Sequence, residues 1–241
     1  MHAEVLHIAV ASNFSQTIKT LVATFEKTSA HSVRLSFASS GKIYAQIKHG
    51  APFDVFFSAD NQKSLLLEAE GLTVEGSRYT YALGQLVLWA NNGTQLLDVE
   101  TRLLNGNFRK LALANPNLAP YGLAAQQTIE NLGLTADTQP KWVQGENIMQ
   151  TYQFIHSGNA DLGFVALSQV YQQDGLSKRN FWLVPDHLYA NIQQDLVWLK
   201  RAQANVAARE FLDFMRQTKA QHIIQAGGYK LPENISKGGV F

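Results

Sequence analysis

The chain has 241 residues, of which 46% are hydrophobic and 16% charged, and a formal net charge of +1. This composition is typical of a globular protein with a sizeable core, and the scattered Lys and Arg residues indicate neither a nucleic-acid-binding nor a membrane-binding surface. The absence of Cys excludes disulfides, thiolate metal sites and thiol nucleophiles, and no apolar run reaches the roughly 18 residues of a membrane-spanning helix.

The first third of the chain alternates between strand and helix patterns. Each short apolar run is followed by a polar turn and then by apolar residues spaced three or four apart, which indicates a helix. Three such units in succession predict a mainly parallel sheet with helices on both faces. The predicted strands cover 5–10, 33–37 and 54–58, and the helices after them begin at Ser12-Asn13, at Ser39-Ser40 and at Asp60 or Asn61.

One long apolar stretch, Tyr79–Asn91, then breaks this rhythm and is a candidate for a strand that leaves one lobe and enters another. A second series follows, with strands at 111–114, 142–143, 161–165 and 181–184 and helices from Tyr121 and Ile148. A return strand is predicted over 194–199, and a helical region extends from it to Gly227. We therefore expect an α/β protein of two lobes, 1–82 with 198–241 and 83–197, joined by two hinge crossings and binding a ligand in the cleft between them.

Four predicted helix starts carry hydrogen-bond donors. The first N–H groups of a helix have no partner inside the helix and carry the positive end of its dipole. The alternative without a ligand is that each polar residue caps its own helix. If the four starts converge, neutral donors alone would suit a small, fully deprotonated oxyanion. These starts are Ser12-Asn13, Ser39-Ser40-Gly41, Pro120-Tyr121-Gly122 and Asn147-Ile148.

Several segments resemble the periplasmic molybdate-binding proteins of ABC transporters. The segment Gly50–Asp60, GAPFDVFFSAD, which follows the turn FASSGK (Phe37–Lys42), is the most specific of them. The opening VASNF (Val10–Phe14) and LGFV (Leu162–Val165) also match, and the resemblance extends from about Val5 to about Leu231. It implies a two-lobed periplasmic-binding-protein fold of type II, in which each lobe is a mainly parallel sheet flanked by helices.

The resemblance also implies a set of oxyanion-binding residues. The family's hydroxyl after the first strand corresponds to Ser12, and the second Ser of its A-S-S turn corresponds to Ser40. The residue before Gly at a helix start in the second lobe corresponds to Tyr121, and an apolar residue that donates its backbone N–H corresponds to Ile148. One branch of the family adds a Tyr where this chain has Ala166; another has an Asn beside the first hydroxyl, which Asn13 matches.

The function that the resemblance implies is a receptor that binds molybdate, and also tungstate, and delivers it to the permease of an ABC transporter. We expect a periplasmic monomer that is not an enzyme and that uses no cofactor, metal cation or nucleic acid, although the start Met1–Glu4 leads straight into the first strand without an export signal. Two alternatives stay open: a receptor for another tetrahedral oxyanion such as sulfate, and a two-lobed transferase or hydrolase that acts on anionic substrates.

An enzyme would need an activated nucleophile and a base. The sequence contains no G-x-S-x-G nucleophile elbow and no His-x-x-x-His pair for a metal. Asp54 and Asp60 flank an apolar strand and are candidate catalytic carboxylates, but a turn anchor and a helix cap are the favoured roles for them.

Overall fold

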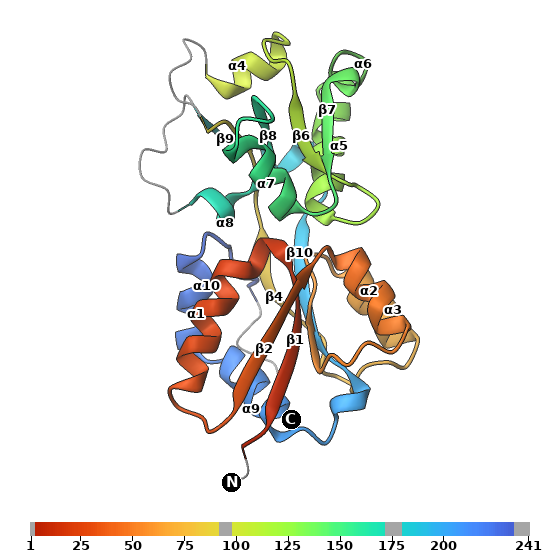
Figure 1. The fold of residues 1–241 in the computed structure, drawn as a ribbon, viewed down its shortest axis with the longest axis vertical. Coiled ribbons are helices and arrows are strands. Elements are labelled where there is room, and N and C mark those ends of the chain that lie inside the picture. Colours follow the sequence, from red (N-terminus) through yellow and green to blue (C-terminus); the bar gives the residue numbers. More distant parts are fainter. Residues whose placement is uncertain (1–2, 92–97, 172–179, 234–241) are drawn as a thin grey trace. The chain divides into compact units, whose positions relative to one another are not determined.

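The structure is a computed structural model that describes residues 3–91, 98–171 and 180–233. It contains two compact units, which we call unit 1 and unit 2 (Figure 1). The chain passes between them twice, because unit 1 is formed by Met1–Leu83 with Gln193–Phe241 and unit 2 by Gly84–Ile192.

Unit 1 contains a five-stranded sheet of order β2-β1-β3-β10-β4. Strands β2, β1 and β3 are parallel, and β10 runs antiparallel to β3. The strands are β1 (Val5–Ala11), β2 (Ser32–Ala38), β3 (Val55–Phe57), β4 (Tyr79–Gly84) and β10 (Ile192–Trp198); the helices are η1 (Ser12–Phe14), α1 (Ser15–Glu26), α2 (Ser40–Lys48), α3 (Gln62–Ala69), η4 (Lys200–Ala202), α9 (Val206–Met215) and α10 (Thr218–Ala226).

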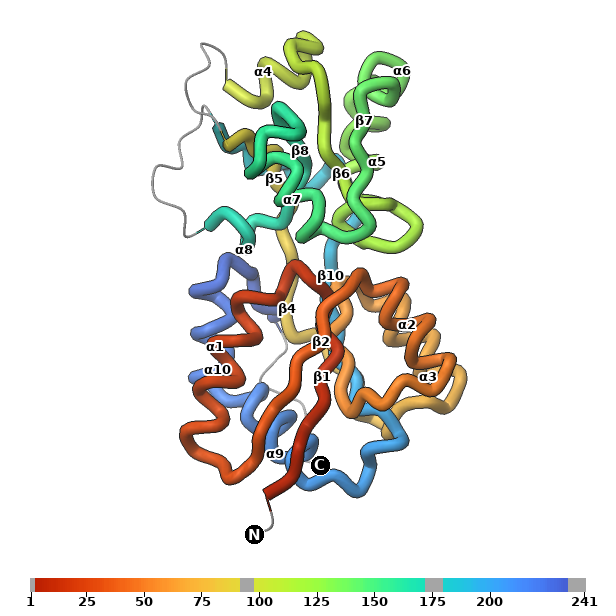
Figure 2. Tube along the Cα trace, viewed as in Figure 1, coloured from red at the N-terminus to blue at the C-terminus, as the bar shows by residue number. Residues whose placement is uncertain are grey.

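Helices cover both faces of this sheet because its central strands are apolar on both sides. Leu6, Ile8 and Val10 of β1 pack with residues of α1, α9 and α10, whereas Ala9 points to the other face and packs with residues of α2 and α3. Figure 2 shows these two groups of helices on opposite sides of β1. The alternation of side chains along a strand thus divides the core of unit 1 into two layers.

Unit 2 contains a second five-stranded sheet, of order β7-β6-β8-β5-β9. Strands β7, β6 and β8 are parallel, and β5 runs antiparallel to both β8 and β9. The strands are β5 (Leu86–Trp89), β6 (Leu111–Ala114), β7 (Trp142–Gly145), β8 (Leu162–Ala166) and β9 (Phe181–Leu183); the helices are α4 (Val99–Leu104), α5 (Pro120–Asn131), α6 (Thr135–Thr138), η2 (Gln139–Lys141), α7 (Ile148–His156), α8 (Leu167–Val170) and η3 (Asp186–Leu188).

The fold class predicted from the sequence is confirmed: each unit is a mixed sheet flanked by helices. The apolar stretch 79–91 passes from one unit to the other, as predicted, and forms two strands, β4 and β5, which are separated by Gln85 and belong to different sheets. The unit boundary lies at Ile192 and Gln193 instead of 197 and 198, because β10 pairs with β3 inside the sheet of unit 1.

Candidate functional site

The ends of two neighbouring strands, β1 and β2, place polar residues side by side at one edge of the sheet in unit 1. The last residue of β1, Ala11, pairs in register with Ala38, the last residue of β2. Ser12, the residue after β1, therefore lies at the same height along the sheet as the turn that follows β2 and contains Ser39 and Ser40. Neighbouring strands lie about 4.8 Å apart, so the structure brings Ser12, Asn13 and Ser40 together within unit 1.

Ser40 is the first residue of α2, and its side chain is fully buried. Its Oγ accepts a hydrogen bond from the backbone N–H of Ala59, with an N to O distance of 2.8 Å. Because this contact occupies a lone pair of the oxygen, it leaves the hydroxyl proton available for donation. Within the described part of the chain, the backbone N–H groups of Ser40 and Gly41 have no partner, whereas that of Ile43 donates to Ser39 O.

The alternative that these serines cap α2 is not supported. Ser39 occupies the N-cap position, but its side chain accepts no hydrogen bond from the helix. Its Oγ is buried and has no hydrogen-bond partner among the described residues. Since the Oγ of Ser40 accepts from Ala59, neither serine side chain accepts a hydrogen bond from the first backbone N–H groups of α2.

Asn13 belongs to a buried hydrogen-bond network in unit 1. Its Nδ2 donates to Gln194 Oε1 at 2.8 Å and to Tyr229 Oη at 3.1 Å, and the Tyr229 hydroxyl donates to the backbone oxygen of Asn13 at 2.9 Å. Gln194 Oε1 also accepts from the Tyr81 hydroxyl at 3.1 Å. Both amide protons of Asn13 thereby have acceptors inside unit 1, so the side chain fixes the turn after β1.

In unit 2, Tyr121 lies at the start of α5, next to the carboxyl end of β6. Pro120 begins this helix, and Tyr121 is 1% exposed. The following Gly122 is required by a close approach, because a Cβ at this position would lie 2.2 Å from Ala114 O. The glycine thus allows the first turn of α5 to pack directly against the end of β6.

Ile148 is the first residue of α7 and follows the carboxyl end of β7. The end of β7 is level with that of β6, because Gly145 pairs in register with Ala114. The Oδ1 of Asn147 caps the helix by accepting from the N–H groups of Met149 and Gln150, both at 3.0 Å. Among the described residues, the N–H of Ile148 is left without a partner.

Gln169 holds the first residue of α7 in place. Its Nε2 donates to Ile148 O at 3.1 Å, and its Oε1 accepts from the N–H of Ala166 at 3.0 Å. Ala166 itself offers no side-chain donor, as expected from the sequence. The structure therefore brings Tyr121 and Ile148 to one edge of the sheet in unit 2, and it adds Gln169 as a positioning residue.

The two candidate carboxylates have structural contacts. Asp60 Oδ1 accepts from the N–H of Lys63 at 2.8 Å, which is a helix-capping contact. Asp54 accepts from the N–H of His7 at 2.8 Å and pairs with Arg201 Nη1 at 2.6 Å. Asp60 therefore has the predicted helix-capping role, whereas Asp54 joins the residue before β3 to β1 and to Arg201 instead of anchoring a local turn. In the described residues, no group of three or more His, Asp or Glu side chains is arranged to hold a metal ion, and no helix is long and apolar enough to cross a membrane.

Comparison with known proteins identifies the family. Residues 6–230 match the model of a family described as bacterial extracellular solute-binding proteins. This chain belongs to that family. Its members bind solutes and are not enzymes, so the prediction of a receptor is confirmed over that of a transferase or hydrolase.

The resemblance to molybdate-binding proteins is also confirmed. The chain is 46% identical to the molybdate-binding protein ModA of Azotobacter vinelandii over 94% of this chain and 90% of that protein. It is 42% identical to ModA of Rhodobacter capsulatus over 92% of this chain and 86% of the relative. The solved periplasmic molybdate-binding protein of A. vinelandii superposes with a TM-score of 0.88 at 40% identity, covering 95% of this chain and all 100% of that one.

Proposed function

We propose that this solute-binding protein binds molybdate, and also tungstate, and delivers it to the permease of an ABC transporter. The observation that carries the proposal is the pair of helix starts, one in each unit, whose N–H groups have no partner among the described residues: Ser40 and Gly41 in α2 and Ile148 in α7. The similarity to two molybdate-binding proteins, those of A. vinelandii and R. capsulatus, supports molybdate as the ligand.

The proposed ligand residues are Ser12, Asn13, Ser40, Tyr121 and Ile148, which would all donate hydrogen bonds to one anion. Molybdate and tungstate are fully deprotonated at neutral pH, so they accept hydrogen bonds at every oxygen and need no acceptor from the protein. The five residues carry no carboxylate, and this disfavours phosphate, whose remaining proton requires an acceptor. Lys42 is exposed and is not needed as a countercharge.

The strength of such a site follows from the number of donors. A hydrogen bond to a charged group contributes roughly 1.5–3 kcal/mol, so about six of them contribute on the order of 10 kcal/mol before the costs of ordering and desolvation. Net binding in the micromolar range or tighter is therefore within reach without a formal positive charge.

We further propose that the protein acts as a monomer in the periplasm and requires no cofactor. This placement follows the description of the related A. vinelandii protein as periplasmic. The permease is the partner implied by a binding protein of an ABC transporter.

Thermal unfolding of protein stripped of ligand tests the proposal. Molybdate and tungstate, each at 100 times the dissociation constant, add about 2.7 kcal/mol to the unfolding free energy. For a chain of this size the midpoint then rises by roughly 5–11 °C. Sulfate and phosphate at the same concentration are expected to give smaller shifts or none. No shift with molybdate or tungstate would reject the proposal, and a larger shift with sulfate would assign the protein to another oxyanion.

A further inference from the structure

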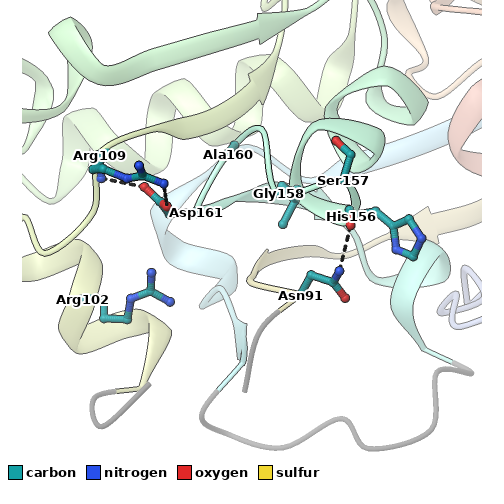
Figure 3. Close-up of a pocket in the computed structure, with 9 residues that line it drawn as sticks. Asn91, Arg102, Arg109, His156, Ser157, Gly158, Ala160 and Asp161 are labelled. Atoms are coloured by element: carbon teal, nitrogen blue, oxygen red, sulfur yellow. Dashed lines mark hydrogen bonds and ion pairs between the residues drawn. The ribbon is translucent and has the colours of Figure 1, made fainter. Parts of the chain in front are cut away.

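Unit 2 contains a polar cavity of about 530 Å³ that includes none of the proposed oxyanion ligands (Figure 3). Two of its lining residues lie before strands: Asp161 immediately precedes β8, and Arg109 lies two residues before the start of β6. Tyr121 and Ile148, in contrast, follow the carboxyl ends of β6 and β7. The cavity therefore lies at the opposite edge of the sheet. The four residues of β6 correspond to about 13 Å of strand between the two edges.

Arg102 of α4 is the distinctive side chain of this cavity. The residue is only 5% exposed, and Figure 3 shows its guanidinium group pointing from α4 into the cavity. Its Nε donates to Asn107 O at 3.5 Å, which is longer than an ordinary N–H···O hydrogen bond. Neither Nη atom has a partner among the described residues, and burial lowers the pKa of Arg102 from its usual value. A guanidinium that is largely enclosed by protein and has so few protein contacts is stabilised by an anion beside it.

The carboxylate that lines the cavity with Arg102 is already engaged. Asp161 Oδ2 accepts from the backbone N–H groups of Arg109 at 2.7 Å and Lys110 at 3.0 Å. Its Oδ1 forms an ion pair with Arg109 Nη2 at 3.1 Å. Arg109 is thus the direct ion-pair partner of Asp161. The charge of Asp161 acts on Arg102 without a direct ion pair between them and only partly offsets the effect of burial on its pKa, so no carboxylate in the described part of the unit pairs directly with Arg102.

The carboxyl end of α7, which also borders the cavity, does not account for Arg102 either. Cations are stabilised at such helix ends by unpaired carbonyl groups. Here Phe154 O accepts from Ala160 N at 2.8 Å, Ile155 O accepts from Gly158 N at 3.0 Å, and His156 O accepts from Asn91 Nδ2 at 2.8 Å. The carbonyl groups of the last turn therefore have other partners.

We propose that this cavity is a second anion site, which binds a carboxylate group of a small organic acid on the guanidinium of Arg102. The planar fork of a guanidinium matches the two oxygens of a carboxylate. Arg109, whose side chain is 86% exposed and uses only one terminal nitrogen for Asp161, supplies a second cation at the mouth. The cavity volume falls in the range of pockets for small organic molecules and exceeds the need of an inorganic ion.

Nuclear magnetic resonance of the arginine Nε–Hε groups tests this site separately from the molybdate site. Titration of the full chain with citrate should shift the signals of Arg102 and Arg109 and the amide signals of Ser157 and Gly158, with saturation in the millimolar range or below. The shifts should be the same in the presence and absence of molybdate. Arg102→Gln should weaken citrate binding at least tenfold and leave the molybdate affinity unchanged.

Arg209→Gln is the matched control, because it removes the same charge from an exposed position of α9 in unit 1. This variant should bind citrate like the original protein. Arg102→Lys keeps the charge without the fork and should bind citrate more weakly than the original protein does. The proposal is overturned if citrate causes no saturable shift, if Arg102→Gln binds citrate as tightly as Arg209→Gln, or if inorganic phosphate binds more tightly than citrate.

Discussion

Replacing Ser40 by Ala separates two consequences of one hydroxyl group. The Oγ of this buried serine accepts the N–H of Ala59 at 2.8 Å, so Ser40→Ala leaves a buried donor unpaired. This should lower the unfolding free energy of the ligand-free protein by about 1–3 kcal/mol. The same change removes a donor to the bound anion, which should weaken molybdate binding by roughly 1.5–3 kcal/mol, or about 10-fold to 150-fold.

Ser39→Ala is the matched control, because the Oγ of Ser39 is equally buried but has no partner among the described residues. Its removal should leave both quantities unchanged or slightly raise the stability. Isothermal titration calorimetry with molybdate gives the affinity, and urea unfolding of the stripped protein gives the stability. Equal molybdate affinities of Ser40→Ala and the original protein would refute the reasoning, as would a larger loss in Ser39→Ala.

Three further predictions concern other contacts. Gln194→Met removes the acceptor of two buried donors and should lower the unfolding free energy, measured in urea, by roughly 2–5 kcal/mol. Gln194→Glu keeps an acceptor and should lower the unfolding free energy by less. Equal decreases in the two variants would contradict the role of Gln194 as the acceptor of these donors. Gly122→Ala places a Cβ 2.2 Å from Ala114 O and should displace the start of α5, weakening molybdate binding about tenfold or more in calorimetry; unchanged binding would contradict it. Burial raises the pKa of Asp161, but hydrogen bonds from Arg109 outweigh this effect and hold it below its usual value, so this carboxylate stabilises the fold at neutral pH and loses that contribution below about pH 4; acid unfolding of Asp161→Asn should lack this dependence.

The order of strands and helices could be predicted because it depends on local spacing. Alternating apolar residues mark β1 and β2, and the change to a spacing of four after Phe37 marks the start of α2. The passage of the stretch 79–91 from one lobe to the other was also predicted, from its unusual length. The position of the break at Gln85 could not be predicted in this way, because it depends on the pairing partners of β4 and β5.

The contacts that position the candidate site were beyond the reach of the sequence patterns. The segment around Ala59 was recognised as distinctive, but its hydrogen bond to Ser40 joins residues 19 apart. Gln194 reaches Asn13 across 181 residues, and neither residue carries a local signal of the other. Arg102 likewise appears in the sequence as one of several scattered cations, and only the packing of α4 reveals that it is buried.

The position of β10 in the first sheet has a consequence for biosynthesis. In that sheet β10 lies between β3 and β4, although it is made more than 100 residues after them. On a ribosome, β4 therefore has to wait for its neighbour until the continuous segment Gly84–Ile192 has emerged. Unit 2 is then the first to complete its fold. The sheet of unit 1 is completed last, when β10 pairs between β3 and β4.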